Sequence, residues 1–146
     1  MTPHFSLKEL TYSWTAEQKG IDNTPNYLQT KNLKRTAELA ERLRAEVLKG
    51  FPMIISSGFR GTELNKIIEG SKTSAHLEGL AIDFTCPKFG TVQEVFNAIA
   101  RSGIEFDQLI IERLEGKEWI HLGLPKSNYR NQLMRIDENG THFVTV

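Results

Sequence analysis

The feature that most constrains this chain is a carboxylate inside an apolar run, at residues 80–84, which read LAIDF. The run is short and follows a glycine, which predicts a strand at residues 80–85. Burying an unpaired carboxylate is costly, so Asp83 must be paired, hydrogen-bonded or bound to a metal ion. The simplest partner is an arginine or a set of backbone amides. Any fold of this chain must place such a partner, or a metal, beside Asp83.

Two histidines could join Asp83 at a metal. His76 lies upstream in a stretch without periodicity, which predicts a loop, and His121 lies in a second apolar strand candidate, residues 119–124. Two imidazoles and one carboxylate are three ligands, the number that a catalytic zinc ion takes while keeping a position for water. Taken alone, each histidine is more simply a polar loop residue or a hydrogen-bonded core residue. The other histidines, His4 and His142, are expected to be structural or exposed.

Hydrolysis at such a centre needs an acid that takes a proton from water and returns it to the leaving group. Glu118 is the first candidate because it lies just before His121. In a regular strand residues 118 and 121 face opposite sides, so Glu118 must precede the strand or lie on a bulge. Glu112, at the end of the neighbouring predicted strand, is the alternative if the strand is regular. Asp107 is expected to be an ordinary strand-start residue or a hydrogen-bond partner of a ligand histidine.

These residues resemble a known family. Residues 74–83, SAHLEGLAID, match the S-x-H-x-x-G-x-A-x-D signature of the zinc D-Ala-D-Ala carboxypeptidase and dipeptidase family, whose members include peptidoglycan-cleaving peptidases and phage endolysins. Residues 118–121, EWIH, match its second motif, and residues 57–60, SGFR, look like the segment that bears its arginine. The motifs fall in the family's order, and a looser similarity extends from Phe5 to about Gln132.

The resemblance implies a role for each matching residue. Glu118 would be the general base and then the acid, and Arg60 would bind the scissile carbonyl or its developing oxyanion, a charge that a fixed guanidinium stabilises. Ser74 would contact the substrate or hold the loop that carries His76. The implied ligands of Zn²⁺ are His76, Asp83 and His121.

The implied function is zinc-dependent hydrolysis of amide bonds in peptidoglycan stem peptides, either at a terminal D-Ala or at an internal bond. Lys72, Lys126 and Arg130 are equal candidates for binding the free carboxylate that a carboxypeptidase substrate carries. The alternative is a non-catalytic zinc-containing binding module of the same fold, because hedgehog signalling domains resemble this family and keep a zinc site.

The charge balance and the apolar pattern argue against a nucleic-acid-binding protein and against a membrane-spanning protein. Lys plus Arg and Asp plus Glu balance at 18 each, so no global field attracts nucleic acid or an anionic membrane. No run approaches the ~20 apolar residues of a membrane span, and the N-terminus lacks a secretory signal pattern. We therefore expect synthesis in the cytoplasm and action on a cell wall only after release or export. The one cysteine, Cys86, excludes an internal disulfide and is expected to pack in the core.

The chain is predicted to be a single α+β catalytic domain, residues 1–146, with a mainly antiparallel central sheet flanked by helices. No oligomeric state is predicted. Residues 1–22 are expected to be irregular, and Pro25 is expected to begin a long helix that ends at Gly50. A capping box at residues 91–94 predicts another helix. Further strands are expected at residues 53–57 and 106–112, with a hairpin from 132 to 146 that turns at Asn139-Gly140.

Overall fold

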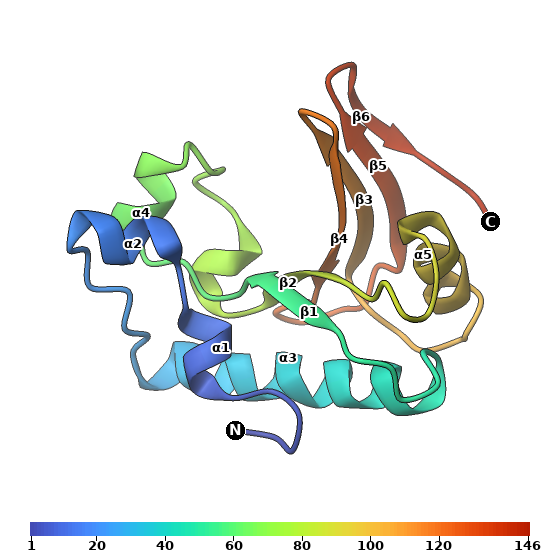
Figure 1. The fold of residues 1–146 in the computed structure, drawn as a ribbon, viewed down its shortest axis with the longest axis horizontal. Helices are drawn as coiled ribbons and strands as arrows, with labels where there is room; N and C mark the ends of the chain where they lie inside the picture. Colours follow the sequence, from blue (N-terminus) through green and yellow to red (C-terminus); the bar gives the residue numbers. More distant parts are fainter.

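The computed structural model describes residues 1–146, and it combines five α-helices with one six-stranded sheet (Figure 1). The helices are α1 (Leu7–Thr11), α2 (Trp14–Lys19), α3 (Tyr27–Glu46), α4 (Thr62–Ile67) and α5 (Val92–Ala100), with a 3₁₀-helix η1 (Ala75–Glu78). The strands are β1 (Ile54–Ser57), β2 (Ala81–Thr85), β3 (Gln108–Leu114), β4 (Lys117–Gly123), β5 (Gln132–Asp137) and β6 (Gly140–Phe143). This confirms the α+β class.

The strands lie in the order β1-β2-β4-β3-β5-β6. Four neighbouring pairs are antiparallel, but β3 and β5 are parallel. The sheet is therefore mixed, and the expectation of a mainly antiparallel sheet is corrected. Parallel neighbours cannot be joined by a tight turn, so the chain leaves β3, forms β4, and returns through residues 124–131 before β5 begins. The predicted Asn139-Gly140 turn joins β5 to β6.

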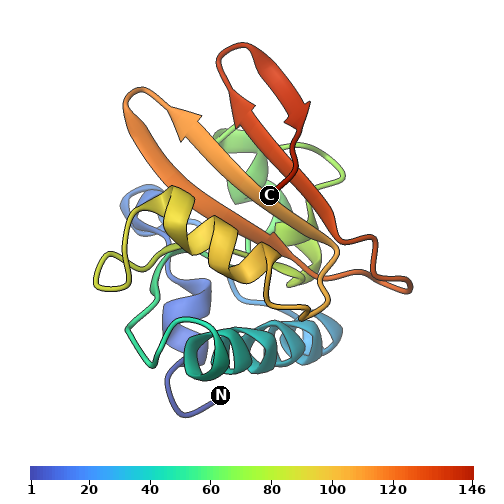
Figure 2. The same ribbon diagram turned by 90° about the vertical axis from the view of Figure 1, so that its right-hand side faces the viewer.

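One face of the sheet forms the hydrophobic core. Side chains alternate along a strand, and the inward set on β2, β3 and β4 is apolar. Helix α3 runs along the base of the molecule in Figure 1, and Figure 2 shows α5 lying against the sheet above it. The core residues contributed by these elements are Leu33, Ala37, Ala40 and Leu43 on α3, Val95, Phe96 and Ile99 on α5, and Ile82, Phe84, Leu109, Ile111, Ile120 and Leu122 on the strands. The opposite face is left for polar side chains.

Capping side chains set the helix ends. Thr91 and Glu94 form the predicted capping box at the start of α5. Helix α3 begins at Tyr27 rather than at Pro25, because Asn26 supplies the cap: its Oδ1 accepts from the Gln29 backbone N–H while the Gln29 side chain accepts from the Asn26 N–H. The predicted start was wrong by two residues, and the helix ends at Glu46 rather than at the predicted Gly50.

The N-terminal residues are more ordered than expected. They form α1 and α2, which are capped by Ser6 and Ser13 and are too short to repeat an apolar stripe in the sequence. Strand β1 was expected to be buried, but it is the edge strand of the sheet and Ile54 is exposed. None of the helices is both long and apolar enough to cross a bilayer.

Candidate metal centre

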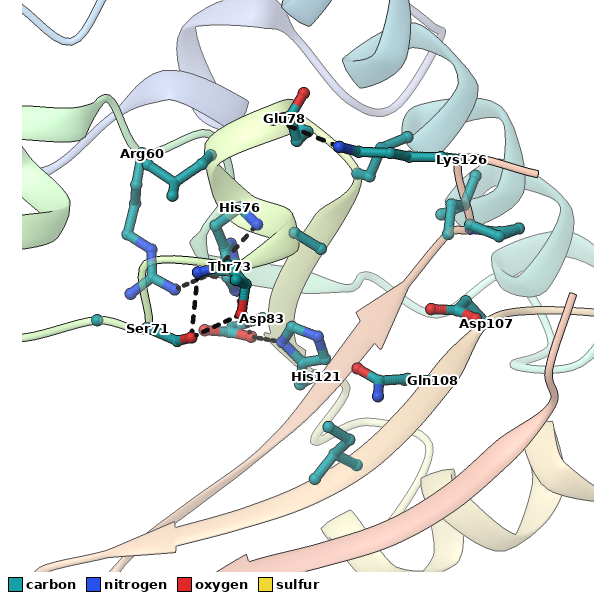
Figure 3. A pocket seen from close by; sticks show the side chains of 18 of the residues that line it. Arg60, Ser71, Thr73, His76, Glu78, Asp83, Asp107, Gln108, His121 and Lys126 are labelled. Atoms are coloured by element: carbon teal, nitrogen blue, oxygen red, sulfur yellow. Dashed lines mark hydrogen bonds and ion pairs between the residues drawn. The ribbon is translucent and has the colours of Figure 1, made fainter. Parts of the chain in front are cut away.

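Three side chains meet on the sheet face opposite the core: His76, Asp83 and His121 (Figure 3). Asp83 on β2 and His121 on β4 are direct partners in neighbouring strands, while His76 comes from η1. Asp83 Oδ1 lies 3.2 Å from His76 Nε2 and 3.0 Å from His121 Nδ1. All three residues are buried, and one ligand atom from each lies within 4.8 Å of the others. The structure thus brings together the three residues that the sequence nominated as metal ligands.

The spacing of these atoms fits a tetrahedral cation. Zinc bonds of 2.0–2.2 Å to nitrogen and oxygen place neighbouring ligand atoms roughly 3.3–3.5 Å apart, close to the two distances observed. His76 Nδ1 lies 2.7 Å from the Gly58 carbonyl oxygen, which can only accept, so Nδ1 carries the proton. In neutral His76, Nε2 then carries a lone pair and no proton, and it faces Asp83. The ionised carboxylate of Asp83 can also only accept hydrogen bonds, so two acceptors face each other. A cation between the two acceptors resolves that conflict.

Asp83 keeps a negative charge in this buried setting. Burial alone would raise the pKa of Asp83, but the charge of His76 when its ring is protonated, together with the hydrogen bond from His121, outweighs burial and holds the pKa below its usual range. Burial would likewise lower the pKa of His121, yet the hydrogen bond and the charge of Asp83 raise it. A buried carboxylate beside two imidazoles is a donor set suited to zinc.

Two glycines allow the backbone to hold His76 in place. Gly79 ends η1 at φ +76°, and a Cβ there would lie 2.5 Å from the Gln29 carbonyl oxygen. Gly58, the acceptor for His76, passes so close to Leu10 that a Cβ would lie 2.2 Å from the Leu10 carbonyl oxygen. Both contacts are with backbone atoms that cannot easily move, so each position requires glycine.

Glu112 lies on the same face as the metal cluster. It pairs with Trp119 across β3 and β4, both line the pocket, and Trp119 Nε1 donates to Glu112 Oε2 at 2.6 Å. Burial, reinforced by the nearby charge of Asp83, raises the pKa of Glu112. An acid with these properties beside a metal is suited to taking up and releasing a proton.

Glu118 lies on the other face. Strand β4 pairs residue by residue with β3 and has no bulge, so Trp119 and His121 share one side while Glu118 takes the opposite one. The Glu118 carboxylate forms an ion pair with Arg113, its direct partner on β3, and Glu118 does not line the pocket. Glu118 therefore lies away from the metal cluster, whereas Glu112, the alternative acid, lines the pocket.

Arg60 reaches the site from the segment between β1 and α4. Figure 3 shows its guanidinium on the same side of the pocket as His76, and Arg60 Nη2 donates to Ser74 Oγ at 3.2 Å. Burial lowers the pKa of Arg60, and the charges of Asp83 and Glu112 oppose that shift. Ser74 Oγ also accepts from the His76 backbone N–H at 3.2 Å, so Ser74 holds the His76 loop. Contact of Ser74 with a substrate stays a prediction.

A pocket of about 1160 Å³ opens above the metal cluster, and its walls include residues 70–78, 124–128 and 130. Two of its three candidate carboxylate-binding cations already have acidic partners. Arg130 binds Asp107 through two hydrogen bonds of 2.6 and 2.7 Å, and Lys126 Nζ lies 3.8 Å from Glu78 Oε1. Asp107 therefore serves Arg130 and not a ligand histidine. Lys72 also lines the pocket and forms no ion pair.

Comparison with known protein families gives a match over most of the chain. The family model described as peptidase M15 matches residues 3–123, and no curated protein matches the chain. The matched range runs from before α1 to the end of β4, so it contains the three clustered residues together with Arg60, Ser74 and Glu112.

Proposed function

Because the chain belongs to the peptidase M15 family, we propose that it is a zinc-dependent peptidase that hydrolyses amide bonds in peptidoglycan stem peptides. The observation that carries the proposal is the convergence of His76, Asp83 and His121 at a pocket that Glu112 and Arg60 also line. The family supplies the reaction class. The peptidoglycan substrate is inferred from the S-x-H-x-x-G-x-A-x-D signature at residues 74–83.

The chemistry divides among the residues of the pocket. Zinc held by the three ligands would supply Lewis acidity and make water acidic enough to attack an amide near neutral pH. Glu112 would accept the proton of that water and deliver it to the departing amine. Trp119 engages Oε2 of Glu112 and so fixes the carboxylate, leaving Oε1 for the water. Arg60 would stabilise the negative charge that develops on the carbonyl oxygen.

The pocket favours cleavage of an internal bond. Its volume of about 1160 Å³ exceeds the roughly 300–1,000 Å³ of sites for drug-sized ligands, so it accepts several residues of a peptide. A carboxypeptidase needs a cation for the free carboxylate; Arg130 is engaged by Asp107 and Lys126 lies beside Glu78, which leaves Lys72 as the unpaired candidate. The preference for an extended stem peptide therefore rests on the volume of the pocket.

A digestion with paired acid variants tests this function. Zinc-loaded protein is incubated with purified peptidoglycan, and the released fragments are identified by mass spectrometry. We expect Glu112→Gln to keep its zinc but to lose roughly 10²- to 10⁴-fold in rate, since a proton-transfer group contributes about that factor. The matched variant Glu118→Gln should cleave as fast as the unaltered chain, because Glu118 is paired with Arg113 outside the pocket.

Each result has a definite meaning. Loss of activity in Glu118→Gln alone would return the acid–base role to that residue. Unchanged peptidoglycan after incubation with zinc-loaded protein would refute the proposed substrate.

A further inference from the structure

Arg60 lies in a part of the chain that neither a helix nor a strand fixes. Residues 58–61, here called the Arg60 segment, join the end of β1 to the start of α4. The guanidinium has a single hydrogen bond, to Ser74 Oγ at 3.2 Å, and its buried Nε has no partner. The direction in which the guanidinium points therefore depends on how the backbone of this segment is held.

Asn23 binds the backbone on both sides of Arg60. Its Oδ1 accepts from the Gly61 N–H at 2.7 Å, and its Nδ2 donates to the Phe59 carbonyl at 3.0 Å. The other Nδ2 hydrogen goes to the Thr11 carbonyl at 2.9 Å. Turning the amide over would break all three bonds, so these partners fix its orientation. One half-buried side chain thus ties the peptide before Arg60, the peptide after it and the end of α1.

Backbone hydrogen bonds hold the rest of the Arg60 segment, including one from the Asn65 N–H to the Gly61 carbonyl at 2.9 Å. The Phe59 N–H donates to the Leu10 carbonyl at 2.7 Å, and the Arg60 N–H donates to the His76 carbonyl at 3.1 Å. Gly61 approaches Asn23 closely, since a Cβ on Gly61 would lie 3.4 Å from Asn23 Oδ1. Asn23 is the only side chain that binds both peptides flanking Arg60, and it lies outside the pocket lining.

We propose that Asn23 is a positioning residue that aims Arg60 at the reacting carbonyl by bracketing it with hydrogen bonds to Phe59 and Gly61. The inference rests on the proposed function, in which Arg60 stabilises the developing oxyanion. Asn23 itself touches neither substrate nor metal ligands. Its loss removes one hydrogen bond from each of the peptides on either side of Arg60, and a shift of about 1 Å in a group of this kind can cost on the order of 100-fold in rate.

A double-mutant cycle tests the link. Asn23→Ala, Arg60→Ala and the double variant are compared for kcat and KM on a purified stem-peptide fragment, and for zinc content. We expect Asn23→Ala to lower kcat roughly 10- to 100-fold, with KM nearly unchanged and zinc retained. In the Arg60→Ala background the same change should cost little more, because effects that act through one group are not additive. Fully additive losses, or an unchanged kcat in Asn23→Ala, would overturn the proposal.

A structural readout and a matched control accompany the kinetics. Hydrogen exchange at the Gly61 amide should quicken in Asn23→Ala, because that amide loses its acceptor. Ser13→Ala is the control: it removes the cap of α2, bonded to the Ala16 N–H at 3.2 Å, without touching the Arg60 segment. Its kcat should match that of the unaltered chain. An equal loss in Ser13→Ala would assign the effect to general loosening and refute the role of Asn23.

A second variant covers the case in which Asn23→Ala does not fold. Asn23→Asp keeps the acceptor for Gly61 and replaces both donors, so kcat should fall and the loss should again vanish in the Arg60→Ala background. Full activity in Asn23→Asp would overturn the inference. If Arg60→Ala hydrolyses the substrate at the normal rate, the role of Arg60 in the proposed function is refuted as well. If Arg60→Ala is impaired and Asn23→Ala is not, only the positioning role of Asn23 is refuted.

Discussion

The two halves of the candidate site are held by different kinds of bonding. Asp83 and His121 lie on neighbouring strands, where the backbone ladder between β2 and β4 fixes their separation. Arg60 and His76 lie outside the strands and depend on individual contacts: Gly58 and Ser74 for His76, Ser74 and Asn23 for the Arg60 segment. The positions of Asp83 and His121, here called the strand half, are therefore set by the fold as a whole. The positions of Arg60 and His76, here called the loop half, can be lost through a change in a single side chain outside the pocket.

The largest effect should come from the strand half, by removal of a ligand. His121→Ala leaves two of the three ligands, so we expect zinc content to fall from about one ion per chain to nearly none and hydrolysis to drop by more than ~10³-fold. Elemental analysis after dialysis checks this, together with thermal unfolding with and without added zinc. Zinc should raise the unfolding temperature of the unaltered chain only, because binding stabilises the folded state.

His142→Ala is the control for that experiment. His142 lies on β6 beside Asp137, far from the metal cluster in the strand order, and the variant should bind zinc normally. Zinc retained at full stoichiometry in His121→Ala would remove His121 from the ligand set.

A change at Gly58 should break the loop half while leaving the strands intact. Gly58→Ala places a Cβ 2.2 Å from the Leu10 carbonyl oxygen, so the Arg60 segment or α1 must move. We expect a loss of about 1–3 kcal/mol in the free energy of unfolding, with slower hydrolysis because Gly58 also orients His76. Urea denaturation and kcat measure the two effects.

The matched control is Gly103→Ala, at φ +81° with open space around the added Cβ. It should cost about 1–2 kcal/mol from backbone strain alone and leave kcat unchanged. Equal kcat values for the two glycine variants would show that the close packing of Gly58 does not matter to the site.

The smallest effect should come from Ser74. Ser74→Ala removes the hydrogen bond to Arg60 and the bond to the His76 N–H, each long at 3.2 Å. A bond of this kind contributes about 1 kcal/mol, so we expect a several-fold loss in kcat with zinc retained. Ser74→Thr keeps the hydroxyl and should restore most of the rate. A failure of Ser74→Thr to restore it would point to packing, not hydrogen bonding, at this position.

The sequence predicted the pairing of His76 with Asp83 because its evidence is local, whereas His121 was added through a second motif farther along the chain. A buried carboxylate needs a partner, and the motif at residues 74–83 places His76 and Asp83 together in one short segment. The hairpin turn and the capping box were likewise predicted and confirmed, since each depends on a few adjacent side chains. The parallel pairing of β3 with β5 was missed because it depends on how distant segments return to the sheet.

The other site residues could not be assigned from motif spacing. Glu118 matches a family motif and was the first candidate for the acid, but the unbroken pairing of β4 with β3 turns it to the opposite face. Strand alternation named Glu112 only as the alternative for a regular strand, and the sequence could not show whether the strand was regular. The sequence did not indicate a role for Asn23. All three of its hydrogen-bond partners are backbone atoms, which every residue type has, so they cannot be recognised from the sequence.

The position of β4 between β2 and β3 decides when the three clustered residues can meet during synthesis. Asp83 is translated well before His121, and the hairpin of β3 and β4 must dock against β2 before the two side chains meet. A nascent chain from which β4 has not yet emerged lacks His121, one of the three clustered residues. The cluster of His76, Asp83 and His121 is therefore complete only after most of the polypeptide has emerged and β4 has paired with β2.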